Sequence, residues 1–309
     1  MKNTKHPRMV AARRWRRGVW VTGILSAIVV LFVYLAGYFD RDPVHLYPAI
    51  GVHAPGPPPI AVVSFSGDMG LRFLLGASTS RGLTEHGIPV VGITTPALFA
   101  RSRTRGELDA IVANGVRTAL ARTGAKRVVV MGQSYGADIV QTGLADLPPA
   151  LRARVAAIVL ILPGDTVFYR ADPSSLLYDH GTPDSMGTTT GNRLTWAPVT
   201  CIYGVEETDS LCPMLTTANA RKVGMPGGHN IRHDADGLLG HVLGAIRAVA
   251  PAAERVSEVG GVSGRRSALG SALQGARRFC HRSPVSELHP ARIVATPNRH
   301  PSESWDLIV

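Results

Sequence analysis

Short apolar segments alternate regularly with segments of helical character between residues 60 and 249. The apolar segments are rich in valine and isoleucine, which is typical of strands buried on both faces of a sheet. Strands that alternate with helices form a parallel sheet covered by helices on both faces. The sequence therefore predicts an α/β fold. Strands are expected at 60–67, 88–94, 127–132, 155–163, 199–204 and 221–226, and helices before 86 and at 104–123, 136–147 and 237–249.

The helix expected at 104–123 carries clear boundary signals. Thr104 and Glu107 have the spacing of a capping box, in which each residue satisfies a backbone N–H near the helix start. Gly124 follows the last apolar position, as is common at a helix C-terminus. The apolar residues between these ends fall on one face, and we interpret them as core.

The stretch VVVMGQSYGADIV, residues 128–140, places Ser134 between a predicted strand and a predicted helix. Its GQSYG segment has the pattern G-x-S-x-G of the nucleophile elbow of α/β-hydrolases. The two glycines let strand and helix approach closely, so the hydroxyl of Ser134 is expected at the carboxyl edge of the sheet. A glycine-rich turn of a Rossmann-like unit is the alternative interpretation.

A serine nucleophile needs a base and an acid that holds the base. In α/β-hydrolases both follow the serine in the chain, each on the loop after a later strand. The segment VEETDSLCP offers Asp209, which we prefer because its D-x-x-x-P spacing resembles the usual acid loop. Glu206 and Glu207 are interpreted as solvated loop residues. The segment GGHN offers His229 as the base, and His233 is the reserve candidate.

The oxyanion formed by such a nucleophile needs two amide donors. We expect one from Tyr135 at the helix N-terminus and a second from the loop FSGDMGLRF, where Gly67 and Asp68 supply amides and that of Asp68 is preferred. The Asp68 side chain, and Asp138 one helical turn after the serine, are candidates for binding a cationic group of the substrate. A turn former and a first-turn helix acid are the alternative interpretations.

Residues 18–38 form 21 positions without a charge, close to the roughly 20 that cross a hydrocarbon core as a helix. The basic residues at 1–17 hold this end in the cytoplasm by the positive-inside bias. We therefore expect a single-pass signal anchor in the inner membrane, with a cytoplasmic N-terminus and a periplasmic catalytic domain. A cleaved signal peptide is the alternative, but its apolar region usually runs about 7–15 residues before a small-residue cleavage site, which we do not find.

Most of the net charge of +11 comes from an excess of basic residues at the two ends of the chain. Seven Lys or Arg and no acid fall within 1–17, and eight against five acids within 252–309, so 18 basic and 17 acidic residues remain between. Phosphate binding needs a clustered basic surface on the folded part, so we expect no nucleic-acid partner. The expected organisation is a basic segment at 1–17, an anchor at 18–38, a proline-rich linker at 39–59, an α/β-hydrolase domain at 60–250 and a disordered tail at 251–309.

Cys201 and Cys212 bracket the acid loop, and an oxidising periplasm would permit a disulfide that pins the acid in place. Cys280 is left over in the tail. C-x-x-C metal spacing is absent from the sequence, and we expect neither a metal nor an organic cofactor. The insertion at 164–197 is too long for an ordinary connection and is interpreted as a lid over the site or as a disordered surface loop.

Five separated motifs, SFSGDMG, GIPVVGI, GQSYGAD, CIYGVEETDSLCP and MPGGHN, resemble in order and spacing those of a family of bacterial virulence proteins that includes VirJ and AcvB. The resemblance covers about residues 60–250. It implies an exported α/β-hydrolase that cleaves aminoacylated phosphatidylglycerol, notably the lysyl form, and a link to type IV secretion. The implied nucleophile, acid and base fall on Ser134, Asp209 and His229.

The chain departs from this family pattern where Met69, Leu71, Gln133 and Asn230 replace a glycine, a tryptophan, a tyrosine and a histidine. These changes leave the triad intact and alter the pocket, where we expect Gln133 and Asp138 to contact the substrate. Two functions are carried forward. The first is a membrane-anchored periplasmic serine esterase acting on a phospholipid or another acyl ester, and the second is a secretion accessory protein that binds export substrates on a hydrolase fold.

Overall fold

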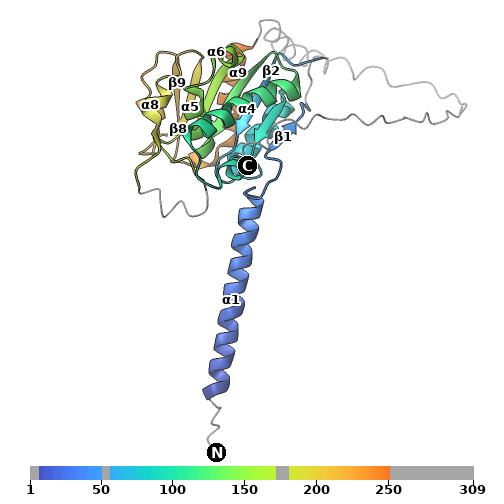
Figure 1. Ribbon diagram of the computed structural model, residues 1–309, viewed down its shortest axis with the longest axis vertical. Helices are drawn as coiled ribbons and strands as arrows, with labels where there is room; N and C mark the ends of the chain where they lie inside the picture. The colour runs from blue at the N-terminus through green and yellow to red at the C-terminus, as the bar shows by residue number, and fades with distance from the viewer. Residues whose placement is uncertain (1–6, 51–55, 172–180, 251–309) are drawn as a thin grey trace, which may run out of the picture. The chain divides into compact units, whose positions relative to one another are not determined.

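The computed structural model describes residues 7–50, 56–171 and 181–250, so the predicted disordered tail lies outside the described residues. A seven-stranded sheet stands at the centre of the described chain (Figure 1). Its strands are β1 (Val44–Tyr47), β2 (Ile60–Phe65), β3 (Val90–Ile93), β4 (Arg127–Gln133), β5 (Val155–Ile161), β8 (Val199–Gly204) and β9 (Ala220–Met225). Their spatial order is β1-β3-β2-β4-β5-β8-β9.

All neighbouring strands of this sheet run parallel except β1, which runs antiparallel to β3. Every residue of β2, β3 and β5 is buried, which is why these segments are apolar on both faces. After β3 the chain crosses to β4 on the other side of β2 and then runs outward through β5, β8 and β9. Because these strands are parallel, their carboxyl ends lie at one edge of the sheet. The predicted α/β-hydrolase class, with a mostly parallel sheet and helices on both faces, is confirmed.

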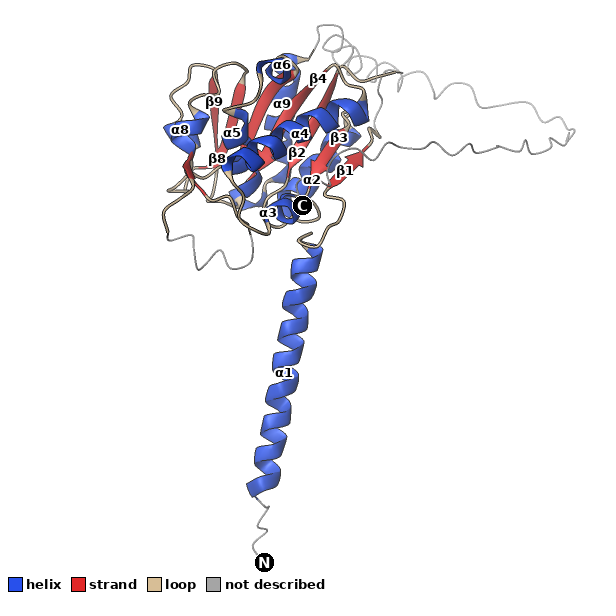
Figure 2. Ribbon diagram, in the orientation of Figure 1, coloured by secondary structure: helices blue, strands red, loops and turns tan. Residues whose placement is uncertain are grey.

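Helices cover both faces of the sheet (Figure 2). One face is covered by α4 and α5, and the other by α2 and α9, whose apolar residues form a core with the strands. The helices are α1 (Pro7–Leu35), α2 (Leu74–Glu85), α3 (Thr95–Phe99), α4 (Arg105–Thr123), α5 (Tyr135–Leu144), α6 (Pro149–Arg152), α8 (Gly187–Gly191) and α9 (Ala235–Val249), with short 3₁₀ turns η1 (Cys212–Met214) and η2 (Ile231–His233).

The predicted ends of α4 are confirmed in detail. Thr104 Oγ1 accepts a hydrogen bond from the Glu107 amide at 3.3 Å, and the Glu107 carboxylate accepts one from the Thr104 amide at 2.7 Å. Gly124 ends the helix in the left-handed conformation with φ of 68°. These contacts are local in sequence, which is why the sequence could predict them.

Residues 44–47 correct the prediction of an extended linker over 39–59. They form β1 at the edge of the sheet, with Val44 opposite Ile93 and Tyr47 opposite Val90. Val44 is buried, Leu46 is exposed, and His45 and Tyr47 are half-buried. The sequence did not predict this strand for two reasons. Its pairing partner β3 lies far along the chain, and the segment around β1 is rich in proline.

The insertion predicted at 164–197 is described except for residues 172–180. Within it β6 (Thr166–Val167) pairs antiparallel with β7 (Ser185–Met186), and α8 follows. Thr190 of α8 donates a hydrogen bond to Gln141 of α5 at 2.5 Å, and both side chains are buried. The described part of the insertion is therefore packed against α5.

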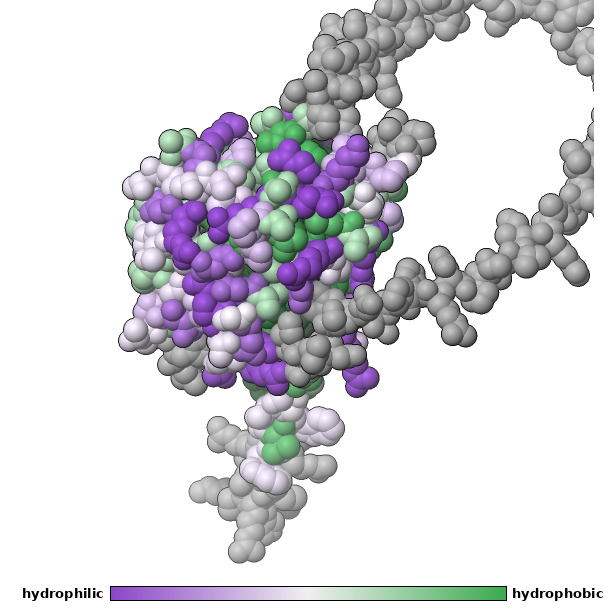
Figure 3. Space-filling model, turned by 45° about the horizontal axis from the view of Figure 1, so that its top comes forward, coloured by the Kyte–Doolittle hydropathy of each residue, from purple (hydrophilic) through white to green (hydrophobic). Residues whose placement is uncertain are grey.

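The N-terminal helix α1 includes residues Gly18–Leu35, which are long and apolar enough to cross a membrane, a criterion that a secretory signal sequence also meets. Its apolar side chains are exposed, as Ile24 and Ile28 illustrate at 56% each. On the face drawn in Figure 3, by contrast, the folded domain intermixes hydrophilic and hydrophobic residues. The apolar surface of α1 requires a cover that the described residues do not supply.

Candidate active site

The predicted nucleophile Ser134 occupies the turn between β4 and α5. Its backbone has φ of 50° and ψ of −127°, and its amide donates to the carbonyl oxygen of Ile161 at 2.7 Å. The turn is tight because α5 lies directly against β2: a Cβ on Gly136 would meet the backbone oxygens of Phe65 and Ser66. The second glycine of GQSYG is thus required by close approach, as the elbow motif predicts.

His229 lies over this serine from the loop that follows β9. Its Nε2 is 2.8 Å from Ser134 Oγ, which is hydrogen-bond distance. The loop reaches back through Gly227, with φ of 101°, and then through three consecutive residues of positive φ, Ile231 to His233. The structure therefore brings together the two residues predicted as nucleophile and base, from positions far apart in the chain.

The carboxylate that contacts His229 belongs to Glu207, which corrects the prediction of Asp209. Glu207 Oε1 lies 2.5 Å from His229 Nδ1. Asp209 is exposed, and its backbone carbonyl accepts a hydrogen bond from the Asp165 amide at 3.0 Å. Ser134, His229 and Glu207 therefore form a continuous hydrogen-bonded array in the order nucleophile, base and acid.

Backbone hydrogen bonds explain why Glu207 holds this place. The Glu207 amide donates to Gly204 at 3.0 Å, which closes a tight turn at the end of β8, and the Glu206 amide donates to Gly227 at 3.0 Å, which ties that turn to the histidine loop. The Glu207 side chain is only 8% exposed, contrary to its interpretation as a solvated residue. Its Oε2 is buried and has no hydrogen-bond partner among the described residues.

The array changes the proton affinity of the imidazole. The hydrogen bond to Glu207 raises the pKa of His229 above its usual value, outweighing the opposite effect of partial burial. The charges of Glu207, Asp68 and Asp209 act in the same direction as the hydrogen bond. The carboxylates therefore stabilise the imidazolium that forms when His229 accepts a proton.

Both predicted oxyanion donors belong to segments that adjoin Ser134. Tyr135 begins α5, so its amide lies in the first turn of the helix, and its ring packs edge-to-face on Phe99 at 5.8 Å. A Cβ on Gly67 would lie 3.4 Å from Ser134 Cβ, so the loop after β2 runs beside the nucleophile. Asp68 follows Gly67 and lines a cavity of about 240 Å³ together with Ser134.

Several residues that the sequence analysis singled out near the site also line this cavity of about 240 Å³. Gln133, Met69, Asn230 and His233 are among its lining residues. His233, the reserve candidate for the base, is thus close to the site, whereas the hydrogen bond to Ser134 Oγ comes from His229.

A larger, acidic cavity of about 470 Å³ adjoins the other side of His229. Its carboxylates come from Asp138, Glu206, Glu207 and Asp209. Asp138 Oδ1 accepts from the Gly164 amide at 2.8 Å, and burial raises the pKa of Asp138 well above its usual value. Glu206 pairs with Arg232 at 3.0 Å. Within the described ranges, no three His, Cys, Asp or Glu side chains are arranged to hold a metal ion.

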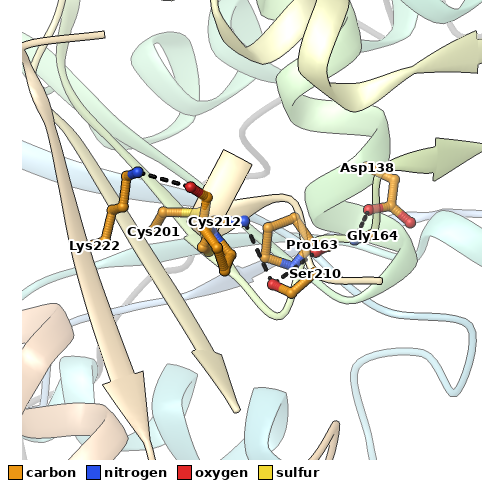
Figure 4. The surroundings of a disulfide bond; sticks show 8 residues. Asp138, Pro163, Gly164, Cys201, Ser210, Cys212 and Lys222 are labelled. Carbon is orange, nitrogen blue, oxygen red and sulfur yellow. Dashed lines mark hydrogen bonds between the residues drawn. A yellow bond between two sulfur atoms is a disulfide. The ribbon is translucent and has the colours of Figure 1, made fainter. Parts of the chain in front are cut away.

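A disulfide joins Cys201 of β8 to Cys212 beyond the acid loop, with the Cα atoms 5.5 Å apart (Figure 4). Ser210 Oγ donates to the carbonyl of Pro163 at 3.4 Å, and Lys222 Nζ donates to that of Pro213 at 2.9 Å. Both ends of the loop that carries Glu207 are therefore fixed to the sheet. Cys280 lies outside the described residues.

Comparisons with known proteins place this site in context. The sequence model of a family described as bacterial virulence protein (VirJ) matches residues 59–250. No curated protein matches the chain.

Solved structures to which the chain is similar include the following three. Est1E from Butyrivibrio proteoclasticus is 12% identical with a TM-score of 0.47, covering 66% of this chain and 95% of its own. An esterase of Pyrococcus furiosus is 14% identical with a TM-score of 0.46, covering 62% and 81%. An α/β serine hydrolase of Xanthomonas campestris described as having no lid is 18% identical with a TM-score of 0.44, covering 68% and 90%.

Proposed function

Because the chain belongs to the VirJ family of bacterial virulence proteins, we propose that it is a serine ester hydrolase. The observation that carries this proposal is the hydrogen-bonded array in which His229 contacts Ser134 on one side and Glu207 on the other. A serine hydroxyl becomes a competent nucleophile when such a base and acid are in reach. Ser134 is then the nucleophile, His229 the base and Glu207 the acid.

The reaction follows from this arrangement. Ser134 Oγ attacks the ester carbonyl carbon while His229 Nε2 takes its proton, and Glu207 stabilises the imidazolium. The amides of Tyr135 and Asp68 hold the oxyanion, each such donor contributing roughly 3 kcal/mol to transition-state stabilisation. The intermediate collapses with release of the alcohol, which receives the proton from His229. A water activated by His229 then cleaves the acyl-enzyme and frees the acid.

The proposed substrate is an aminoacyl ester of phosphatidylglycerol, such as the lysyl form. The acidic cavity that His229 lines supports this choice, because the exposed carboxylate of Asp209 lies there together with that of Glu206. An acyl group with ammonium substituents is attracted to such a cluster of carboxylates. His229 lines both this cavity and the smaller one that contains Ser134, so an amino acid held here would lie beside the proposed base.

The proposed location is the periplasmic side of the inner membrane, with α1 as an uncleaved anchor. The described apolar span of 18 residues, at about 1.5 Å per residue, is about 27 Å long and close to the roughly 30 Å of a hydrocarbon core. The disulfide between Cys201 and Cys212 is suited to an oxidising compartment.

Fluorophosphonate labelling of the full-length chain in detergent tests the nucleophile. We expect one label on Ser134, no label after Ser134→Ala, and full labelling of a control variant, Ser78→Ala, whose serine is exposed on α2. A folded wild-type chain that stays inert would overturn the enzyme assignment and favour the accessory protein that binds secretion substrates.

Lipid extracts test the substrate. Cells that make the wild-type chain should hold less aminoacyl-phosphatidylglycerol than cells that make Ser134→Ala, with the other ester lipids unchanged. Loss of a different ester lipid would keep the hydrolase and replace the proposed substrate.

A further inference from the structure

The last turn of α1 lies on the loop that lines the candidate active site, here called the oxyanion loop and comprising residues 66–73. Ala36, the residue that directly follows α1, is fully buried, and a Cβ on Gly70 would meet its carbonyl oxygen. Gly70 also has φ of 72°, so both space and backbone conformation require glycine at this position. Phe32 of α1 stacks on Phe73 of the loop with ring centroids 6.4 Å apart.

The chain that leaves α1 is fastened to the sheet within a few residues. Asp40 Oδ2 lies 2.7 Å from His45 Nε2 and accepts a hydrogen bond from Thr94 Oγ1 at 3.3 Å. The Thr94 amide donates to Pro43 at 2.8 Å, and β1 begins at the next residue, Val44. The connection between α1 and the sheet is therefore a bonded segment rather than a free tether.

The oxyanion loop, which contacts Ala36 through Gly70, also lies against the nucleophile through Gly67. Gly67 lies against Ser134, and the loop supplies Asp68, Met69, Gly70 and Phe73 to the cavity beside it. Two residues span at most about 7 Å of chain, so Asp68 lies within that distance of the residue that contacts Ala36. One short loop thus connects the end of α1 to the proposed oxyanion donor.

This distance is comparable to the thickness of a headgroup layer. With Gly18–Leu35 across a hydrocarbon core, Ala36 stands at the edge of that core. The headgroup layer beyond it is about 5–8 Å thick. The oxyanion loop contacts Ala36 at Gly70, and from there to Asp68 it extends at most about 7 Å, so it remains within this layer. The mouth of the cavity would then open on lipid headgroups and not on bulk water.

We propose that the last turn of α1 is a positioning element of the active site, which holds the oxyanion loop against Ser134 and keeps the cavity open at the bilayer surface. The substrate is then a lipid of the same leaflet, whose ester reaches the nucleophile without leaving the headgroup layer. This inference uses the proposed hydrolase function for its activity readout, whereas its geometric part can be tested without any turnover.

A depth measurement tests the geometry. In a Cys280→Ser background, the variants Arg72→Cys and Lys126→Cys each carry a fluorophore on the introduced cysteine. Both side chains are exposed. Arg72 belongs to the oxyanion loop, whereas Lys126 precedes β4 at the amino edge of the sheet, away from that loop. The full chain is reconstituted in phosphatidylcholine vesicles that contain a headgroup nitroxide quencher. We expect loss of fluorescence at residue 72 and none at residue 126. Equal quenching at both sites, or a mature chain whose intact mass lacks α1, would overturn the proposal.

A matched pair of α1 variants tests the positioning role. Phe32→Ala removes the ring that stacks on Phe73, whereas Tyr34→Ala removes an aromatic ring that is 59% exposed two residues further along. On a soluble short-chain ester in detergent, we expect Phe32→Ala to lower kcat about tenfold with KM unchanged, since small misplacements of catalytic groups have effects of that size or larger. Tyr34→Ala should match wild type, and Phe32→Tyr should restore the rate.

Equal rates for Phe32→Ala and Tyr34→Ala, at unchanged thermal stability, would overturn the positioning role. A wild-type chain that neither turns over the ester nor takes the fluorophosphonate label would instead overturn the proposed hydrolase. The quenching measurement would still decide the position of the oxyanion loop in that case.

Discussion

The two edges of the parallel sheet differ in which residues adopt a left-handed backbone. At the amino edge, the turns before β3 and β4 use glycine, with φ of 77° at Gly87 and 68° at Gly124. At the carboxyl edge, Ser134, Leu162 and residues 231–233 have positive φ without being glycine. Across the described ranges, every non-glycine residue with positive φ lies at this second edge.

The difference shows where the chain tolerates strain. A non-glycine residue in this conformation costs of order 1–3 kcal/mol and persists only where the surroundings hold it. At the amino edge the turn needs no particular side chain, so glycine can occupy the positive-φ position and avoid the conformational strain. At the carboxyl edge Ser134 must present a hydroxyl to His229, and glycine has none. Strain and the candidate site therefore coincide, and the following predictions test this contrast.

The largest effect is expected from the acid loop at the carboxyl edge. Glu207→Gln should lower kcat for ester hydrolysis about 10³- to 10⁴-fold, because the amide cannot hold the imidazole tautomer or stabilise its cation. Asp209→Asn, two residues further on the same loop, should keep kcat for a short uncharged ester within a few-fold of wild type. Steady-state kinetics of both variants checks this. The opposite ranking would restore Asp209 as the acid and contradict the contacts described above.

Removing the covalent closure of that loop should have the next largest effect. The double variant Cys201→Ala/Cys212→Ala frees a loop of 11 residues in sequence separation. Loop-closure entropy alone predicts a loss of about 3 kcal/mol in the free energy of unfolding. Thermal unfolding of the full chain in detergent measures this loss, and wild type under reducing conditions should reproduce it. A variant as stable as the oxidised wild type would show that the carboxyl edge needs no such support.

Introducing a glycine at the carboxyl edge and removing one at the amino edge should shift stability in opposite directions. Ser134→Gly should raise the free energy of unfolding by about 1 kcal/mol while abolishing fluorophosphonate labelling, because it relieves a positive φ. Gly124→Ala should lower it by about 1 kcal/mol and leave labelling intact. Thermal unfolding and labelling of both variants test the pair. Changes of the same sign would remove the contrast between the edges.

The smallest expected effect is a displacement of the pH profile. His229 must be neutral to act as a base, and its pKa is raised chiefly by the hydrogen bond to Glu207. The acidic limb of the kcat/KM profile should therefore lie above the usual histidine value of about 6.5, and Glu207→Gln should move it down. An acidic limb that is unchanged in this variant would exclude Glu207 as the controlling group.

The same raised pKa fixes the sign of its contribution to stability. The charged imidazole stabilises the folded chain below the unfolded-state pKa, and this contribution is lost as pH rises through the folded-state pKa. The contribution is screened because the His229 side chain is 54% exposed.

The sequence predicted those parts of the fold that are decided locally. Thr104, Glu107 and Gly124 mark both ends of α4 because a capping box and a left-handed glycine each involve only residues within one helical turn. The buried strands could also be predicted from the sequence, because strands that are buried on both faces consist of continuous runs of valine and isoleucine. Ser134 and His229 were found because a motif and a fixed chain order specify them.

The remaining features depend on contacts between distant segments. Whether Glu207 or Asp209 reaches the imidazole depends on the bond from the Glu206 amide to Gly227, which joins two separate loops. Both acids lie on the same short loop, and the weight given to the D-x-x-x-P spacing favoured the wrong one. The sequence signal that could have identified Glu207 is its position in the tight turn directly after the strand end at Gly204, which these two residues close.

The bond between Cys201 and Cys212 also bears on when the site becomes complete. In a reducing compartment both residues would remain thiols, and the segment that carries Glu207 would be closed by hydrogen bonds alone. If the chain is exported as proposed, the newly synthesised form is immature until this disulfide forms. At the proposed periplasmic location, the site would then acquire its full rigidity only after export, where the proposed lipid substrate is presented.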